Sequence, residues 1–303
     1  MAATTGPATT GPTPRVAPRR RLSGLALLLS IAVILFAIFF VVPVVLLFAT
    51  GFNPPNADQI RPTLSFTLAN VEQFFQSSDD VTGLSNSVSL AVLTSLLSAL
   101  LGYPVAYVLA RTRNPTRNAV LLTLVLIPLQ VDMVIRSYGM LVLFGNNGLI
   151  NHSLINSRLI SSPLPLMYNH FGVVLGLLQL SIPFMVLALT GIISGIDFDV
   201  VHAARTLGAS FWQSFFTITL PLSVPGLLAG ALLIFAMTIS SYSIPVLLGG
   251  MHVIVLPILI YQQVATFGNW QLAAAAAVVL FVISLTAVYL YQVVAQRWVG
   301  EEL

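Results

Sequence analysis

Two opposite charges lie inside an otherwise apolar stretch of this 303-residue chain. Asp132 and Arg136 are four residues apart, with the acid nearer the N-terminus, which is the favourable order for a pair on one helix face. A charged side chain at membrane depth costs about 2.5–3.5 kcal/mol, so it normally faces a protein interior or a water-filled path. The pair and the nearby Tyr138 are therefore candidates for the wall of a path through a membrane. A self-neutralising structural pair near the outer interface is the alternative interpretation.

A second polar group interrupts a later apolar stretch. It consists of Ser240, Ser241, Tyr242 and Ser243, and Pro245 follows it. Hydroxyl groups and a proline inside a spanning helix loosen the helix and offer hydrogen bonds to a solute. The Tyr242 ring can also stack on an alkylammonium group. Ser241 and Tyr242 are therefore further candidates for the path, although helix packing through small residues explains the serines equally well.

Groups that catalyse reactions or bind metals do not assemble in this sequence. The four histidines are scattered among the expected loops and lack the spacing of metal ligands. The absence of cysteine excludes disulfides and thiol chemistry. The absence of lysine excludes a phosphate loop of the form G-x-x-x-x-G-K. We expect no enzyme, no metal site and no cofactor in this chain, so any ATP hydrolysis must come from a separate subunit.

A loop with small residues at a defined spacing lies between two apolar stretches. Ala203 and Ala204 leave a helix face without bulky side chains, so another surface can approach it closely. Gly208 follows and can adopt the left-handed conformation that ends a helix. Pro221 suits the first turn of the next helix. The pattern predicts a short helix, a sharp stop, a second amphipathic helix and a return into the membrane. We call this segment, at about residues 195–221, the docking loop.

Capping residues support the two helices of the docking loop. Asp197 or Asp199 can accept the unpaired amide hydrogens of the first helix, and Ser210 can do so for the second. The first helix is expected to end at Leu207. Apolar side chains at i, i+3 and i+4 of the second helix predict a stripe along the membrane interface, formed by Trp212, Phe215 and Phe216.

The composition places this chain in a membrane. Hydrophobic residues make up 57% of it and charged residues only 7%, whereas a soluble domain carries about 25% charged residues. Several apolar stretches exceed the roughly 18 residues that mark a membrane span. The basic residues are all arginines and are spread along the loops, so we expect no nucleic-acid partner.

The apolar stretches predict an all-α, polytopic membrane protein with six transmembrane helices. Residues 1–21 are rich in Ala, Thr, Gly and Pro, which predicts a disordered cytoplasmic tail before a transmembrane domain at residues 22–303. The first span, at about Leu22–Thr50, is too long for a signal peptide. A short helix is expected in the first external segment, around Leu68–Phe75. The remaining spans are expected at about Asn86–Ala110, Asn118–Phe144, Phe171–Ser194, Leu222–Leu248 and Trp270–Gln296.

The arginines predict the orientation of the six helices, because positive residues accumulate in cytoplasmic loops. Only Arg61 and Arg158 lie on one side, and Arg136 lies within the third span. Both termini and the docking loop lie on the other side, which is therefore cytoplasmic (N-in, C-in). The segments Gly145–His170 and Met251–Gly268 are then external loops. The nine arginines on the cytoplasmic side are Arg15, Arg19, Arg20, Arg21, Arg111, Arg113, Arg117, Arg205 and Arg297.

The docking loop resembles the "EAA" loop of permease subunits of bacterial ABC importers. That pattern is E-A-A, three residues, G, nine residues, I, one residue, L-P; here Ile218, Leu220 and Pro221 close it, and His202 replaces the leading Glu. The resemblance implies a type I ABC importer permease fold with a coupling helix that docks into a groove of an ATPase subunit. The coupling residues that it implies are His202, Ala203, Ala204, Arg205, Leu207, Gly208, Ala209 and Pro221.

A second resemblance concerns the substrate. Pro128, Arg136, Ser137 and Tyr138 match a third-span pattern of polyamine-type permeases. The docking loop and the span after it resemble the branch that includes spermidine/putrescine, iron(III), thiamine and phosphonate importers. The resemblance implies an inner-membrane permease for a small solute, a polyamine or related amine, with opines and organic anions left open. One departure is Asn269, because the spermidine/putrescine subfamily often has Asp before the tryptophan of the last span.

The resemblance also implies partners. They are a dimer of ATP-binding subunits that uses the ATP, a second homologous permease subunit, a periplasmic substrate-binding protein and the lipid bilayer. A competing hypothesis is a proton-coupled secondary transporter that uses Asp132 as a proton relay. Such a protein would work from this chain alone and would depend on Asp132 but not on the docking loop.

Overall fold

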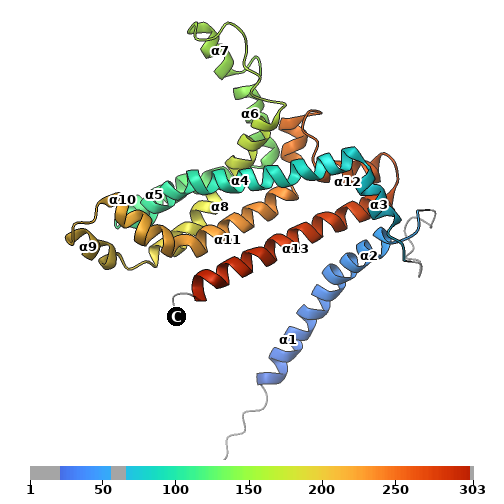
Figure 1. The fold of residues 1–303 in the computed structure, drawn as a ribbon, viewed down its shortest axis with the longest axis horizontal. Helices are drawn as coiled ribbons and strands as arrows, with labels where there is room; N and C mark the ends of the chain where they lie inside the picture. Colours follow the sequence, from blue (N-terminus) through green and yellow to red (C-terminus); the bar gives the residue numbers. More distant parts are fainter. Residues whose placement is uncertain (1–20, 56–65, 301–303) are drawn as a thin grey trace, which may run out of the picture. The chain divides into compact units, whose positions relative to one another are not determined.

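The structure is a computed structural model that describes residues 21–55 and 66–300, with side chains described for residues 29–55 and 66–296. All regular elements in these ranges are helices (Figure 1). The chain divides into two units, Met1–Leu46 and Leu47–Leu303. The predicted disordered tail, apart from Arg21, lies outside the described residues, so it stays a prediction.

The first span is a helix with a local widening before a proline. It comprises α1 (Arg21–Phe36), η1 (Ala37–Val41) and α2 (Val42–Gly51). In η1 the amide of Val42 donates to the carbonyl of Ala37, five residues back. Pro43 follows at once, and its ring disfavours normal helical bonding, so the wider turn lets the helix continue. The side chains of residues 29–46 are exposed except at Ala37 and Val44, which are partly buried, whereas residues 47–50 are partly buried and Gly51 is buried.

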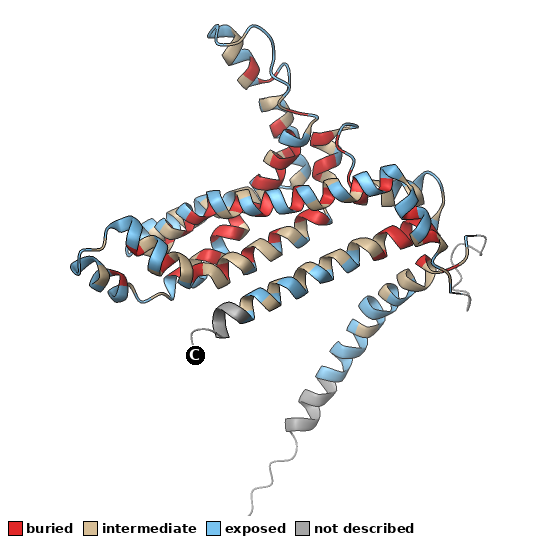
Figure 2. Cartoon of the chain, in the orientation of Figure 1, coloured by how far each residue is buried: buried red, intermediate tan, exposed pale blue. Residues whose placement is uncertain are grey.

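Three long helices form the centre of the second unit. They are α4 (Ser78–Arg111), α8 (His170–Ser194) and α11 (Leu220–Ile239), and they pack side by side with their buried residues facing one another (Figures 1 and 2). Glycines allow the close approach: a Cβ atom on Gly102 would lie 3.0 Å from Cγ of Met185, and one on Gly230 would lie 2.8 Å from its Sδ. Small residues at such contacts are typical of helices that associate inside membranes.

Helix α4 is longer than its apolar stretch. It begins at Ser78, eight residues before the predicted start at Asn86. Ser77 caps it by accepting a hydrogen bond from the amide of Asp80, and Asp79 and Asp80 complement the helix dipole in its first turn. Arg111 in the last turn complements the other end. The extension is therefore specified by capping chemistry rather than by hydrophobicity.

The last span, α13 (Trp270–Gly300), packs against α11, α12 (Leu256–Ala265) and α3 (Ala69–Gln76). Helix α3 confirms the short helix predicted around Leu68–Phe75. Asn70 anchors it, because its side-chain amide donates to the carbonyls of Gly51 and Asn53 at 2.9 and 2.7 Å. A buried cluster closes this region and consists of Phe74, Leu256, Leu272 and Ala276.

The predicted continuous third span at Asn118–Phe144 is wrong. The segment is broken into α5 (Pro115–Gln130) and α6 (Met133–Phe144), and the bend between α5 and Met133–Asn156 is 94°. Val131 is extended, and Asp132 starts a new helix by accepting a hydrogen bond from the amide of Val134 at 2.8 Å. The described residues therefore contain five helices that are long and apolar enough to span a membrane, or six if the bent pair is one span.

Two predicted external loops and one predicted span also need correction. The segment Gly145–His170 contains the helix α7 (Leu149–Asn156), and Met251–Gly268 contains α12. The fifth span was expected to reach Leu248. Its regular helix ends at Ile239, and the chain turns at the hydroxyl-rich group before the short wide helix η3 (Pro245–Gly249).

Candidate functional site

The first helix of the docking loop is α9 (Phe198–Thr206). The carboxylate of Asp197 caps it by accepting a hydrogen bond from the amide of Asp199 at 2.9 Å, which confirms the first predicted cap. Gly208 ends it with a φ of +95°, so the predicted left-handed glycine is confirmed. The amide of Ala209 donates back to the carbonyl of Ala204 at 3.1 Å and closes the turn.

Helix α9 presents most of its surface to the surroundings. Val201 is its buried residue, whereas Leu207, just after the helix, is 90% exposed. An exposed leucine beside a face of small residues has the character of a protein contact surface rather than of a solvated loop. Figure 1 shows α9 beyond the ends of α4, α8 and α11. Of the predicted coupling residues, His202, Ala203, Arg205, Leu207 and Gly208 are exposed, while Ala204, Ala209 and Pro221 are partly buried.

The second helix of the docking loop is not a separate helix. Ser210 caps α10 (Phe211–Ser214) in a reciprocal arrangement with Gln213, which confirms the second predicted cap. The helix then continues through the wide turn η2 (Phe215–Thr219) into α11, so 211–239 is one helix of 29 residues. Pro221 lies in the first turn of α11 as expected, but α11 continues from η2 and does not begin a separate span. The wide turn accommodates the proline, since the Leu220 amide donates to the carbonyl of Phe215, five residues back.

An aromatic cluster fixes this helix to α4. Phe215 packs edge-on against Tyr103 and Tyr107, with ring centroids 5.4 and 5.9 Å apart, and Phe211 packs against Tyr107 at 6.1 Å. Tyr103 also shares a buried hydrogen bond of 2.7 Å with Ser223. The predicted interfacial stripe is therefore divided: Phe215 faces the protein, whereas Trp212 and Phe216 are 65% and 57% exposed.

Arg111 connects α4 to α9, the first helix of the docking loop. Its guanidinium carbon lies 4.2 Å from the ring centroid of Phe198, the first residue of α9, and 4.9 Å from that of Tyr107. Such cation–π contacts contribute about 0.5–2 kcal/mol. The Nε and Nη2 atoms of Arg111 are buried and have no hydrogen-bond partner among the residues that the structure describes. The sequence predicts Arg111 only as a positive loop residue, because Phe198 lies far away along the chain, although Tyr107 is one turn away on α4.

The two charges of the broken third span have different environments. Asp132 is exposed and uses its carboxylate as the helix cap of α6. Arg136 is partly buried, and within the described part of the chain its buried Nε and Nη1 atoms have no hydrogen-bond partner. Tyr138 is 57% exposed. The structure therefore leaves a cation with unused donors on α6 rather than a neutralised pair.

The hydroxyl-rich group lies near the same helix. Ser241 and Tyr242 are partly buried, and the Tyr242 ring packs on Tyr261 at a centroid distance of 5.2 Å. Tyr242 and Met133, the first residue of α6, both border the hydrophobic cluster that contains Met140 and Leu248. The candidate path residues thus share one region of the second unit, while their role in transport stays a prediction.

Residues 13–300 match the protein family described as "Binding-protein-dependent transport system inner membrane component". The spermidine/putrescine permease protein PotB of Haemophilus influenzae is 34% identical over 178 residues, which cover 59% of this chain and 62% of PotB. PotB of Escherichia coli is 31% identical over 54% of this chain and 60% of that protein. The chain thus matches less than two thirds of the length of these polyamine relatives.

A relative named for a different solute aligns over more of the chain. The molybdenum permease protein ModB of Haemophilus influenzae is 31% identical over 223 residues, which cover 72% of this chain and 94% of ModB. Among solved structures, a chain of a bacterial importer of the acidic polysaccharide alginate aligns with a TM-score of 0.71 at 20% identity, covering 91% of this chain and 96% of that chain. A chain of the MetNI methionine transporter aligns with a TM-score of 0.54 at 17% identity, covering 72% and 95%. The alginate and methionine transporter chains therefore share the fold of this chain.

Proposed function

This chain belongs to the family of binding-protein-dependent transport system inner membrane components, and on that premise we propose that it forms part of the translocation path of an ATP-driven importer for a small solute. It is a multi-pass protein of the bacterial inner membrane and not itself an enzyme. The observation that carries the proposal is the docking loop. Its first helix, α9, is capped at its start and ends at Gly208, which has a positive φ. The helix exposes small residues and is followed by the exposed Leu207, so this surface can contact another protein.

The proposed mechanism uses the docking loop as a lever. Closure of an ATPase dimer would displace α9, and two connections would carry that displacement into the membrane. One is the continuous helix 211–239, which contains η2 and α11. The other is the contact of Phe198 with Arg111 at the end of α4. Because α4, α8 and α11 are packed as one core, moving the loop reorients all three helices together.

The proposed partners follow from this arrangement. An ATPase dimer needs two docking loops, so a second, homologous permease subunit is required to supply the other. A periplasmic binding protein would deliver the solute from outside. The alginate transporter, which shares the fold, was solved in complex with a periplasmic protein that holds an alginate pentasaccharide. The chain carries the docking surface for an ATPase but no lysine for a phosphate loop of its own.

Two substrate classes have support. A polyamine or related amine is favoured by the similarity to PotB and by the exposed carboxylate of Asp132. An anion is favoured by Arg136, whose buried Nε and Nη1 atoms have no acceptor, and by the similarity to ModB over most of its length. A buried donor without an acceptor costs about 1–3 kcal/mol, and an anionic solute would supply the acceptor during transport.

The proton-coupled alternative has less support. A relay carboxylate should be free to exchange protons along a buried path, whereas Asp132 is exposed and holds the cap of α6. The family membership also favours transport that is driven by a separate ATPase.

The proposal is tested by identifying what co-purifies with the tagged full chain from detergent-solubilised membranes. Mass spectrometry should find an ATPase, a second permease and a periplasmic binding protein, and the ligand of that binding protein identifies the solute. Recovery of this chain alone, together with solute uptake by the chain alone in liposomes, would support the proton-coupled transporter instead.

A further inference from the structure

The turn between α4 and α5 contains a basic pocket of about 370 Å³. Three arginines line it, namely Arg111, Arg113 and Arg117, and none of its described lining residues is acidic. The pocket lies at the end of α4 that the arginine distribution places in the cytoplasm. A cluster of positive charge at the edge of a membrane attracts anionic lipid headgroups.

Side-chain hydrogen bonds order the turn between α4 and α5. The side-chain amide of Asn118 donates to the carbonyl of Leu109 at 2.9 Å and so satisfies the end of α4. Asn114 caps α5 by accepting a hydrogen bond from the amide of Arg117 at 3.1 Å. The N-terminus of α5 therefore adds its partial positive charge to the pocket. Arg111, which lines the pocket, also has buried Nε and Nη2 atoms that find no acceptor among the described residues.

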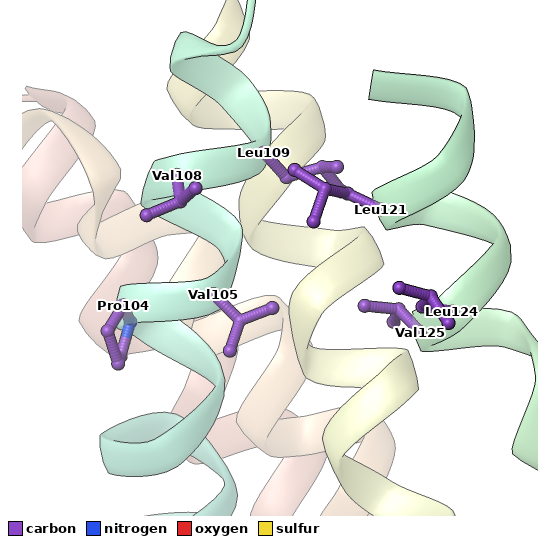
Figure 3. A pocket seen from close by; sticks show the side chains of 7 residues that line it. All are labelled: Pro104, Val105, Val108, Leu109, Leu121, Leu124 and Val125. Atoms are coloured by element: carbon purple, nitrogen blue, oxygen red, sulfur yellow. The ribbon is translucent and has the colours of Figure 1, made fainter. Parts of the chain in front are cut away.

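An apolar groove of about 450 Å³ adjoins the basic pocket between α4 and α5. Val108 lines both, so the two pockets are neighbours along α4. Figure 3 shows the groove side chains on the two helices. Several of them are large and exposed, including Val105 at 40% and Leu124 at 59%. The groove is lined by Pro104, Val105, Val108, Leu109, Leu121, Leu124 and Val125.

We propose that the basic pocket and the groove together bind one anionic phospholipid of the inner leaflet. The arginine pocket holds the phosphate, and one acyl chain lies in the groove between α4 and α5. A basic pocket that continues into an apolar groove matches the two parts of such a lipid, whereas a free anion would occupy only the pocket and an apolar ligand only the groove. The site is separate from the docking surface, but Arg111 also contacts Phe198 at the start of α9. A lipid phosphate beside Arg111 would therefore stabilise the contact between Arg111 and Phe198, which holds α9 to the end of α4.

The test uses the full chain purified together with its co-purifying subunits. Binding of dioleoyl phosphatidylglycerol and dioleoyl phosphatidylcholine is measured by native mass spectrometry from mixed micelles. The double variant Arg113→Gln/Arg117→Gln removes two exposed arginines and should weaken phosphatidylglycerol binding about thirtyfold, with phosphatidylcholine binding unchanged. Arg158→Gln removes an exposed arginine on the predicted external side, outside both the docking loop and the basic pocket, and is the matched control that should leave lipid binding at the wild-type level.

A second variant separates a lipid from a free phosphate. Val105→Trp fills the groove from an exposed position and should weaken binding of phosphatidylglycerol at least tenfold. Binding of water-soluble glycerol 1-phosphate should stay as it is, because that molecule has no acyl chain. The proposal is overturned if the two lipids bind equally well, or if neither variant changes phosphatidylglycerol binding. Cross-linking of the groove to a co-purified subunit would assign it to a protein contact and would overturn the proposal as well.

Discussion

Gly208 offers the sharpest test of the docking loop. Its φ of +95° lies beyond the left-handed range near +57° that other residues occasionally adopt. A Cβ atom added to Gly208 meets nothing within 4 Å, so a substitution causes no clash and acts through the backbone alone. For Val, which is β-branched, the backbone strain is about 2–3 kcal/mol.

The strain can be relieved if the last turn of α9 unwinds. The loss of about 2–3 kcal/mol then lowers the population of the docking conformation by about 30- to 150-fold. Gly208→Val should therefore reduce solute uptake in proteoliposomes by at least tenfold, while ATP hydrolysis by the partner subunits becomes less dependent on the solute. Gly208→Asn should lie between the wild type and Gly208→Val, because Asn tolerates positive φ better than β-branched residues do.

A matched control is present in the same chain. Gly268 also has a positive φ, +65°, and a Cβ atom there meets nothing within 4 Å. Gly268→Val also forces a β-branched residue into a positive φ, with less strain because +65° lies within the left-handed range, and it does so just before α13, away from the docking loop. Coupled uptake at the wild-type level in Gly208→Val, or equal losses at the two glycines, would refute the argument that the shape of this turn governs coupling.

Three further substitutions address charge. Asp132→Asn keeps the helix cap, because Asn caps as well as Asp does, so it should lower uptake of a cationic solute several-fold at unchanged thermal stability; unchanged uptake would make the carboxylate purely structural. Arg136→Met removes two buried donor atoms that are unpaired among the described residues, so the thermal midpoint of unfolding should stay unchanged or rise. If the solute is an anion, uptake of an oxyanion such as molybdate should fall at least tenfold in this variant. Equal uptake of anionic and cationic solutes by the variant and the wild type would count against a role of Arg136 in selectivity. His202→Glu on the exposed face of α9 should retain the co-purifying ATPase, as measured by quantitative mass spectrometry, and loss of the ATPase would show that His202 has a contact of its own.

Local signals in the sequence predicted the local geometry well. Asp197 and Ser210 cap the two helices of the docking loop as expected, and Gly208 has the expected positive φ. Each of these features depends on the chemistry of one residue and its immediate neighbours. The composition likewise predicted an all-helical membrane protein, because a chain with 7% charged residues has few other ways to satisfy its backbone in a bilayer.

The broken third span could not be predicted from hydrophobicity, although the sequence contains its cause. Asp132 was interpreted as a charge within a continuous helix, whereas its carboxylate satisfies the first turn of a new one. An apolar run hides a break of this kind, because Val131 adopts an extended conformation without any change in hydropathy. A membrane-embedded Asp followed by a new helical pattern is therefore a start signal as well as a candidate for transport.

A local sequence pattern could not predict the contact of Arg111 with Phe198. Tyr107 lies one turn away on α4, but Phe198 belongs to another element, and only the packing of α4 against α8 and α11 brings it near. The basic pocket depends on the same long-range arrangement. The three arginines were expected to share a loop, whereas the structure places Arg111 at the end of α4 and Arg117 in the first turn of α5, with Arg113 between them. Their convergence on one pocket beside an apolar groove required the tertiary structure.

Two connections link the docking loop to the membrane helices: the helix 211–239, and the contact of Phe198 with Arg111 at the end of α4. Their stiffness determines which membrane helices follow a displacement of α9. The helix 211–239 is continuous, but its wide turn η2 is a weak point, because a bond five residues back is less regular than the usual helical bond. The aromatic cluster compensates, since Phe215 in that turn packs against Tyr103 and Tyr107 of α4. A force on α9 therefore acts on α4 through both Phe198 and Phe215. Helices α4 and α11 should then move as one body, with bending confined to the turn between α8 and α9, where Gly195 lies.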